Sequence, residues 1–479
     1  MLLGELVPES TMLSPSDSAL AVTGFALDHR KVAPGTVFGA FPGTKVNGED
    51  FIGAAIDNGA IAVVARSEAR VTGVPHLSAT EPRRLFANIA AAFFAPFPDV
   101  TVAVTGTNGK TSTAELTRQL WRLAGFPAAS IGTLGVTTAD DQISTGLTTP
   151  DVVTFLANMG GLRREGLSHV SFEASSHGLA QYRTEGLPVR AAAFTNLSRD
   201  HLDYHQTMEA YFAAKLRLFA DVVDDDGTAV VWADDGGWSA RVIATARSRG
   251  LRVLTVGTAG DAIQLTSRVP TQLGQTLQII VDGQRRKVEL PLIGAYQAAN
   301  ALVAAGLVMA TGGDPARTID NLARLLPVRG RLERAVIARS GAAVYVDYAH
   351  TPDALRAAVE ALRPHTNGRL RLVFGAGGDR DTGKRSEMGK IAIQLADDVI
   401  VTDDNPRTEV AAEIRAAIMA GAPGAREIGD RRAAIATAIA ASGPDDVVLI
   451  AGKGHEQGQI VGHRVLPFDD VVVARECAS

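Results

Sequence analysis

The sequence predicts an α/β protein with three domains built around mostly parallel sheets. Its length of 479 residues suits about three domains of ordinary size. From residue 100 to about 325, and again from about 343 to 451, β-branched strand patterns alternate with helical patterns, which is typical of parallel sheets with crossover helices. Prolines mark the junctions of these stretches, so we expect domains at residues 1–98, 99–328 and 329–479.

The expected elements follow in chain order. In the small N-terminal α/β domain they are strands at residues 37–41 and 60–65 and a helix at 85–94. In the central domain they are strands at 100–105, 170–173, 191–195, 228–232 and 253–256, short consecutive strands within 263–290, and a helix at 296–309. In the C-terminal, Rossmann-like domain they are strands at 343–347, 370–374, 398–402 and 447–451.

Composition and charge exclude several classes of protein. Hydrophobic residues make up 46% of the chain, charged residues 21%, and the net charge is −5, so we expect no nucleic-acid partner. The first residues lack a signal-peptide pattern, and no apolar run reaches membrane-spanning length, so we expect no membrane partner. The only cysteine is Cys477, which fits a protein of the reducing cytoplasm.

The strongest functional signal is a glycine loop between a β-branched run and a helical pattern. The loop consists of Gly106, Thr107, Asn108, Gly109, Lys110, Thr111 and Ser112. In such a loop, backbone N–H groups and the helix dipole face a phosphate, the lysine neutralises it, and the threonine hydroxyl reaches Mg²⁺. The loop is shorter than the standard Walker A spacing, and a glycine turn without a ligand is the alternative. We expect it to bind a nucleoside triphosphate in a central domain of the phosphate-loop type.

Three further residues of the central domain suit a metal site. Glu173 ends an expected strand, where an acidic side chain of an NTPase commonly approaches Mg²⁺; the alternative is a helix cap. His201 lies in a loop dense in ionisable groups and could ligate metal, or could be a surface histidine. Lys215 lies beside the apolar face of a helix capped by Thr207. A deprotonated lysine there could react with CO₂, although a snorkelling lysine is the alternative.

Polar clusters also follow the expected strands of the C-terminal domain, where ligands bind in sheets of this kind. Arg380 and Arg407 are forked donors that match carboxylates, and Asn405-Pro406 makes a stiff turn before Arg407. Glu456 could bind an ammonium group. Two arginines with one glutamate suit an amino acid that carries an extra carboxylate, whereas surface ion pairs are the alternative.

These motifs together closely resemble the Mur ligase family, which builds the peptide of bacterial cell walls. The matching segments are residues 106–112, 173–178, 196–203, the helix of Lys215, Asn300, 330–331, 347–353 and 452–456. Asp404-Asn405-Pro406-Arg407 resembles the version that selects meso-diaminopimelate; lysine-adding relatives usually lack that arginine. The resemblance implies an ATP-dependent ligase of peptidoglycan precursor synthesis. It would join meso-diaminopimelate to the D-glutamyl γ-carboxylate of UDP-N-acetylmuramoyl-L-alanyl-D-glutamate through an acyl phosphate.

The resemblance also implies a role for each matching residue. Residues 106–112, with Lys110 as a catalytic group, would hold the ATP phosphates, and Asn300, Arg331 and Asp347 would contact the nucleotide. Thr111, Glu173, His201 and Lys215, the last as a CO₂-derived carbamate, would serve Mg²⁺. The UDP-linked substrate would meet Leu27, His29, Thr44, Lys45, Val46, Thr148, Thr149, Ser175, Gln181 and Arg183. The amino-acid pocket would comprise Arg380, Asp404, Asn405, Pro406, Arg407, Gly452 and Glu456.

One departure and three alternatives remain. His29 stands where the family usually has serine, so its nucleotide contact is an open point. The alternative functions are a lysine-adding relative, a ligase like folylpolyglutamate synthetase, and a non-catalytic ATP-binding switch module. The expected oligomeric state is a monomer.

Overall fold

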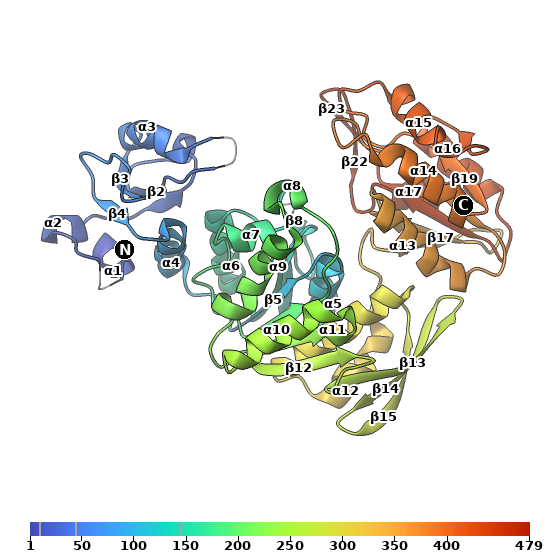
Figure 1. Cartoon of the computed structure of the whole chain (residues 1–479), viewed down its shortest axis with the longest axis horizontal. Helices are drawn as coiled ribbons and strands as arrows, with labels where there is room; N and C mark the ends of the chain where they lie inside the picture. The colour runs from blue at the N-terminus through green and yellow to red at the C-terminus, as the bar shows by residue number, and fades with distance from the viewer. Residues whose placement is uncertain (9–10, 44–45, 144–145) are drawn as a thin grey trace. The chain divides into compact units, whose positions relative to one another are not determined.

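The computed structural model describes residues 1–8, 11–43, 46–143 and 146–479 (Figure 1). These residues divide into two compact units. The first comprises Met1–Ala262 and Val303–Thr318, and the second comprises Ile263–Leu302 and Ile319–Ser479. Helix α11 (Ala295–Ala310) contributes residues to both units.

A small parallel sheet opens the first unit. In the order β1-β2-β3-β4 its strands are Gly24–Ala26, Thr36–Gly39, Ala60–Ala65 and His76–Ser78. The accompanying helices are α1 (Leu3–Leu6), α2 (Pro15–Ser18), α3 (Ile52–Asp57) and α4 (Pro82–Phe94). Helix α4 begins at Pro82 rather than at residue 85, because proline is tolerated in the first turn of a helix. Its Phe86 packs edge-on against Phe25 of β1, with ring centroids 5.5 Å apart.

The larger sheet of the first unit has a parallel centre. In the order β12-β11-β10-β5-β9-β6 its parallel strands are Arg252–Gly257, Thr228–Trp232, Ala191–Phe194, Val100–Thr105, His169–Glu173 and Ala128–Gly132. Antiparallel strands β7 (Gly135–Thr137) and β8 (Gln142–Ile143) continue beyond β6. The helices are α5 (Lys110–Ala124), α6 (Val152–Arg164), α7 (Ser176–Ala180), α8 (Leu202–His205), α9 (Met208–Arg217) and α10 (Gly237–Ser248).

Burial and register explain why this sheet can carry a site at one edge. Val102, Phe172 and Phe194, from three neighbouring strands, are fully buried, as expected for parallel strands covered on both faces. Val104 of β5 lies opposite Glu173 of β9, and Phe194 of β10 lies opposite Thr105. The carboxyl ends of β5, β9 and β10 therefore meet at one edge, which is where ligands bind in such sheets.

The second unit begins with an antiparallel ribbon and continues into an α/β domain. The ribbon strands are β13 (Ile263–Thr271), β14 (Gly274–Val281) and β15 (Gln284–Leu290), as the sequence predicts. Helix α12 (Pro315–Asn321) precedes the α/β domain. In the order β16-β17-β21-β18-β19-β20 its strands are Glu333–Ile337, Ala343–Asp347, Val447–Ala451, Leu370–Phe374, Asp398–Val401 and Arg426–Glu427.

Helices cover both faces of this second sheet, which is parallel except for β16. Leu372 and Phe374 of β18 belong to a core with α13 (Pro352–Leu362), α14 (Lys384–Leu395) and α15 (Ala411–Met419). Val373, which points the other way, belongs to a core with α16 (Arg431–Ala440) and α17 (Asp470–Cys477). The hairpin β22 (Gly458–Val461) and β23 (Arg464–Pro467) stands apart from the sheet.

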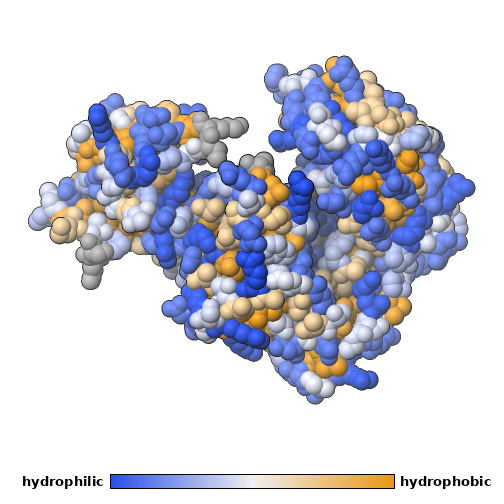
Figure 2. Space-filling view, viewed as in Figure 1, coloured by the Kyte–Doolittle hydropathy of each residue, from blue (hydrophilic) through white to orange (hydrophobic). Residues whose placement is uncertain are grey.

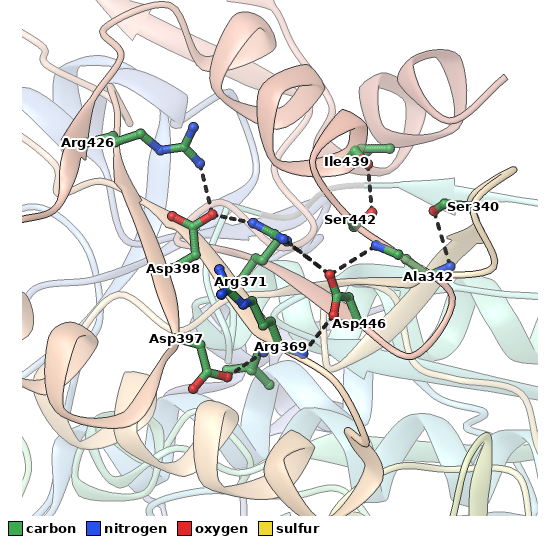
Figure 3. Close-up of polar contacts among 12 residues, drawn as sticks. Ser340, Ala342, Arg369, Arg371, Asp397, Asp398, Arg426, Ile439, Ser442 and Asp446 are labelled. Carbon is green, nitrogen blue, oxygen red and sulfur yellow. Dashed lines mark hydrogen bonds and ion pairs between the residues drawn. The ribbon is translucent and has the colours of Figure 1, made fainter.

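An ion-pair network holds the amino-terminal edge of this sheet (Figure 3). The Arg371 guanidinium of β18 lies 2.5 Å from Asp398 of β19 and 3.2 Å from Asp446, which precedes β21. Asp398 also accepts from Arg426 at 2.9 Å. These pairs tie neighbouring strand starts together and lie at the end of the strands opposite to the predicted ligand-binding loops.

Hydrophilic residues cover most of the face shown in Figure 2, with hydrophobic residues scattered among them. In the described ranges, no helix combines the length and the apolar character needed to cross a bilayer.

Candidate active site

The phosphate loop of the first unit has the expected strand–loop–helix geometry. Strand β5 ends at Thr105, and α5 begins at Lys110. Gly106 and Gly109 both have positive φ angles, of 147° and 86°. A Cβ atom on Gly106 would lie 2.0 Å from Thr195 Oγ1, so only glycine fits there. Lys110 Nζ donates to the carbonyl oxygens of Gly106 and Thr107 at 3.0 and 2.8 Å, so the loop curls around a positive charge.

The segment after β10 braces this loop. Thr107 N–H donates to the Asn196 carbonyl at 2.9 Å, and Asn108 N–H donates to Asn196 Oδ1 at 3.0 Å. Ser198 N–H donates to Thr107 Oγ1 at 3.0 Å. The first residues of the segment 196–203, which also contains His201, therefore stabilise the shape of the phosphate loop.

Lys215 lies inside the protein beside that loop. Thr207 caps its helix α9, accepting from Ala210 N–H at 3.1 Å as predicted. Lys215 is 1% exposed, so the snorkelling alternative is wrong. Its Nζ donates to the Gly106 carbonyl at 2.7 Å and lies 4.5 Å above the centre of the Tyr211 ring. Burial, reinforced by the nearby charge of Lys110, holds the pKa of Lys215 well below its usual value, so a neutral amine is accessible.

Glu173 lies at the carboxyl end of β9 and is 2% exposed. Its Oε1 accepts from Thr133 N–H at 2.7 Å, and its Oε2 accepts from Thr133 Oγ1 at 3.3 Å. Thr111 and Glu173 line the same small cavity, of about 10 Å³. A hydroxyl and a carboxylate are brought together there, and oxygen donors of this kind suit Mg²⁺ that also takes phosphate oxygens.

His201 lies in the loop before α8, with a positive φ of 51°. Its ring meets His177 edge-on, with centroids 4.9 Å apart, and lies 6.1 Å from the Tyr211 ring. Its Nε2 lies 3.4 Å from an oxygen of Asp200. Tyr211 thus contacts both His201 and Lys215. Within the described ranges, no three His, Cys, Asp or Glu side chains gather as a ready-made metal cluster.

Residues predicted to contact the muramoyl peptide form a connected set next to Glu173. Thr149 Oγ1 donates to the Glu173 carbonyl at 2.8 Å, and Ser175 N–H donates to Thr149 Oγ1 at 3.0 Å. Arg183 Nη1 donates to the Thr149 carbonyl at 2.7 Å, and its Nη2 donates to Gln181 Oε1 at 2.8 Å. Thr148 joins the same set, because its hydroxyl lies 3.1 Å from that of Thr133.

The residues predicted to bind the uridine nucleotide are more dispersed. Leu27 lines a cavity in the first unit, and Val46 is exposed. His29 opens a short 3₁₀ turn and stacks on Phe51, with centroids 4.4 Å apart and planes 5° from parallel. Thr44 and Lys45 lie outside the described residues.

In the second unit, Asn300, Arg331 and Asp347 belong to one network. Asn300 Nδ2 donates to Gln297 Oε1 at 3.1 Å, and Gln297 Nε2 donates to the Arg331 carbonyl at 3.0 Å. Leu332 N–H donates to Asp347 Oδ2 at 2.7 Å. Burial raises the pKa of Asp347 to about 6, against the opposing influence of the Arg331 charge.

The two predicted arginine loops follow β18 and β19 and are joined to each other. Gly378 N–H donates to the Asn405 carbonyl at 2.9 Å, and Arg407 Nη1 donates to the Gly378 carbonyl at 2.7 Å. Thr408 Oγ1 donates to Asp379 Oδ1 at 2.7 Å. Arg380 is exposed on the same turn.

An ion pair with a buried arginine supports this junction. Arg385 of α14 lies 2.9 Å from Glu409, which also accepts from Asp379 N–H at 2.5 Å. No local sequence pattern indicates this pair, because its members lie 24 residues apart in the chain.

Asn405 and Glu456 also meet. Asn405 Nδ2 donates to Glu456 Oε2 at 2.7 Å, and Lys453 Nζ donates to Asn405 Oδ1 at 3.0 Å and to Glu456 Oε2 at 3.2 Å. Lys453 is fully buried, and its place in the segment 452–456 did not by itself indicate this role. Gly452 has a φ of 118°, and a Cβ there would lie 2.4 Å from Asp404 Oδ2. Pro406, which lies between Asn405 and Arg407 in the chain, is buried.

The fold and these sites define a nucleotide-using α/β enzyme with a phosphate loop in one unit and arginine-bearing loops in the other. Family models for the Mur ligase family match three stretches of the chain. They are the Mur ligase family catalytic domain at residues 21–100, the middle domain at 104–308 and the glutamate ligase domain at 330–454. The chain belongs to the Mur ligase family, which consists of ATP-dependent amide-forming ligases. The predicted family and the three-domain α/β fold are confirmed.

Curated relatives match over nearly the whole chain. A UDP-N-acetylmuramoyl-L-alanyl-D-glutamate--2,6-diaminopimelate ligase of Zymomonas mobilis is 62% identical over 97% of this chain and 96% of its own length. A ligase of the same name from Bradyrhizobium diazoefficiens is 51% identical over 98% of this chain and 97% of its own.

Solved structures of related ligases also match this chain in overall fold. One of a UDP-N-acetylmuramoyl-L-alanyl-D-glutamate--2,6-diaminopimelate ligase is 33% identical, has a TM-score of 0.76, and covers 100% of this chain and 98% of its own. A folylpolyglutamate synthase of Mycobacterium tuberculosis, complexed with ADP, is 21% identical with a TM-score of 0.62, and covers 77% of this chain and 91% of its own. At that identity the second likeness concerns the fold alone.

Proposed function

We propose that this chain joins meso-diaminopimelate to the γ-carboxylate of the D-glutamyl residue in UDP-N-acetylmuramoyl-L-alanyl-D-glutamate, in the cytoplasm and as a monomer. The observation that carries the proposal is the 62% identity, over 97% of the chain, to a relative named for this reaction. The joined arginine loops of the second unit support it, because an acceptor with an extra carboxylate needs more than one forked cation.

The reaction proceeds in two balanced steps. First, a γ-carboxylate oxygen attacks the γ-phosphorus of ATP, the bond to the bridging oxygen breaks, and ADP leaves. Second, the neutral amine attacks the acyl phosphate, loses a proton, and expels inorganic phosphate as the amide forms. The chain needs no covalent nucleophile of its own for either step. The phosphate loop and Lys110 would offset the charge of the phosphoryl group in flight.

The donor set of the first unit fits a divalent cation. Thr111, Glu173 and His201 would hold Mg²⁺, together with a carbamate formed from Lys215 and CO₂. When bound, the ion would neutralise phosphate charge during transfer. The fit rests on the cavity shared by Thr111 and Glu173 and on the low pKa of the buried Lys215 amine.

The second unit would orient the incoming amino acid. Arg380 and Arg407 would bind its carboxylates, and Glu456, held by Asn405 and Lys453, would accept from an ammonium group. Substitution of Arg407 by alanine tests this assignment. We expect a loss of discrimination between diaminopimelate and lysine worth about 2–5 kcal/mol, measured as a ratio of kcat/KM values. An unchanged ratio would contradict the assignment.

A phosphate-release assay tests the proposed function. Purified protein, ATP, Mg²⁺ and the UDP-linked dipeptide are mixed with one amine at a time: meso-diaminopimelate, L-lysine or L-glutamate. We expect phosphate release and a new amide product, identified by mass spectrometry, with diaminopimelate. Release with lysine instead would favour the lysine-adding alternative. A parallel reaction replaces the dipeptide by a folate substrate, and glutamate addition to that folate would favour the folylpolyglutamate alternative. If no amine stimulated phosphate release, the ATP-binding switch module would be the favoured alternative.

A further inference from the structure

A cavity of about 100 Å³ in the first unit lies between the N-terminal part of the chain and the segments that flank Glu173. It brings together side chains from distant parts of the sequence. Its lining includes Leu27, Phe41 and Arg83 from the N-terminal part, and Asp151, Gln181 and Arg183 from the central part. Arg183 was predicted from the family resemblance, whereas Arg83 matches no motif.

Arg83 reaches this cavity from the first turn of α4. Its Nη2 donates to the Pro42 carbonyl at 2.7 Å, and its guanidinium lies 4.9 Å from the centre of the Phe41 ring. These contacts use a backbone oxygen and an aromatic face, so they fix the direction of the guanidinium without cancelling its charge. Apolar walls around a charged group strengthen any attraction to an ion of opposite sign.

Arg183 is held in the same way. Its hydrogen bonds go to the Thr149 carbonyl and the Gln181 amide oxygen, which are neutral acceptors. In the described part of the chain, neither Arg83 nor Arg183 forms an ion pair with a carboxylate. Asp151 also lines the cavity, but its carboxylate accepts from Val153 N–H, Thr154 N–H and the Thr154 hydroxyl at the start of α6.

The two guanidinium groups repel each other. Burial lowers the pKa of Arg83, and the positive charge of Arg183 lowers it further, although the hydroxyl of Tyr204 acts in the opposite direction. Burial is also the main cause of the lowered pKa of Arg183. Arginine keeps its proton at neutral pH in spite of such shifts. The negative charge of Asp151 partly offsets the lowered pKa of Arg183. Two guanidinium groups therefore share one carboxylate in this part-buried cavity, an arrangement that a bound anion would stabilise.

We propose that Arg83 and Arg183 together bind one anionic group of the UDP-linked substrate, which makes Arg83 a substrate-binding residue. The inference rests on the proposed function. Forked donors match a carboxylate or a phosphate oxygen pair. The group is either the diphosphate of the nucleotide or a carboxylate of the muramoyl peptide, and both chemistries are present on that one substrate.

Binding measurements on the full-length protein test the proposal without requiring turnover. Arg83→Gln keeps a polar side chain but removes the charge, and Arg83→Lys keeps the charge and most of the length without the fork. Arg84→Gln is the matched control, because Arg84 is the next residue of α4, is half exposed, and lies 3.6 Å from Glu185 outside the cavity lining. Thermal unfolding of each variant reports whether it folds.

We expect Arg83→Gln to raise the calorimetric Kd for the UDP-linked dipeptide by about tenfold or more, Arg83→Lys to restore part of the affinity, and Arg84→Gln to leave it unchanged. An equal loss of affinity for UDP alone would identify the diphosphate as the anion. A loss confined to the full substrate would identify a peptide carboxylate. Wild-type affinity for both ligands in a folded Arg83→Gln protein would overturn the inference. Failure of the proposed function would show differently, as wild-type protein that releases no phosphate with any amine.

Discussion

At the scale of single residues, two lysines donate to one carbonyl oxygen. Lys110 and Lys215 both bond Gly106 O, at 3.0 and 2.7 Å. Their mutual repulsion adds to burial in lowering the pKa of Lys215, so its amine gives up a proton more readily than a free lysine does. The proposed carbamate at Lys215 would replace this repulsion by attraction to Lys110.

The proposed carbamate at Lys215 can be tested with the variant Lys215→Ala. We expect kcat to fall by about a hundredfold or more while the UDP-linked substrate still binds, because charge stabilisation is lost rather than substrate contacts. Short carboxylic acids should restore part of the rate by replacing the carbamate. Wild-type protein given ¹³C-bicarbonate should show a carbamate resonance that the variant lacks.

Lys287→Ala serves as the control, because Lys287 is 62% exposed and pairs with Glu289 on the surface. Turnover at the wild-type rate in Lys215→Ala would end the carbamate proposal.

Asp347 gives a pH-dependent prediction at the same scale. Its pKa is about 6 in the folded protein, against a usual value of 3.8, and the side chain is 8% exposed. Because the folded pKa is the higher one, the folded state holds the proton more tightly. The contribution of Asp347 to stability is therefore fully present below pH 3.8 and is lost as the pH rises through about 6.

The variant Asp347→Asn isolates this contribution, because the amide oxygen can still accept from Leu332 N–H. Between pH 4 and pH 7 we expect the unfolding free energy of the wild type to fall by about 2 kcal/mol relative to the variant. Denaturant unfolding at several pH values measures the difference. A difference that stays constant across this range would contradict the assignment of the raised pKa.

At the scale of elements, the two arginine-bearing loops depend on each other. Both follow neighbouring parallel strands, β18 and β19, and the backbone of Gly378 bonds to both Asn405 and Arg407. A Cβ on Gly378 would lie 2.0 Å from the Pro406 carbonyl oxygen. The close approach of the two loops therefore requires glycine at this position.

Gly378→Ala should push the loops apart. We expect the KM for diaminopimelate to rise by about tenfold or more while the KM for ATP stays unchanged. Gly383→Ala is the control, because Gly383 has a φ of −61° and an added Cβ would meet only Asp381 Oδ1, at 3.2 Å. If the two variants bound the amino acid equally well, the joined loops would not form its pocket.

Much of the fold could be predicted at this scale, because buried parallel strands are continuous runs of β-branched and apolar residues. Strands β5, β11, β17, β18 and β21 have the predicted bounds. Strand β6 was missed, since its sequence Ala-Ala-Ser-Ile-Gly has only one β-branched residue. Without β6, Thr133 could not be placed against Glu173. The antiparallel strands β7, β8 and β16 lie outside the alternation of strand and helix, so that pattern does not reveal them.

The candidate site was only partly visible in the sequence, for a different physical reason. Glycine spacing revealed the phosphate loop because the turn itself demands glycine. The burial of Lys215, the Arg385–Glu409 pair and the opposed guanidinium groups of Arg83 and Arg183 arise from tertiary packing. Such features have no local sequence pattern.

At the scale of the whole molecule, the proposed reaction needs both units, because the phosphate loop belongs to the first and the arginine loops belong to the second. The folylpolyglutamate synthase structure covers 77% of the chain, whereas the diaminopimelate ligase structure covers all of it. The chain thus matches the diaminopimelate ligase structure also over the part of its length that the folylpolyglutamate synthase structure does not cover.

Transfer of an isotopic label tests the central claim, that ATP activates a carboxyl group before an amine displaces phosphate. The UDP-linked dipeptide is labelled with ¹⁸O in its D-glutamyl γ-carboxylate and is incubated with ATP, Mg²⁺, diaminopimelate and the full-length protein. We expect one labelled oxygen to leave with each inorganic phosphate formed. Unlabelled phosphate accompanying amide formation would contradict activation of the carboxyl group by ATP.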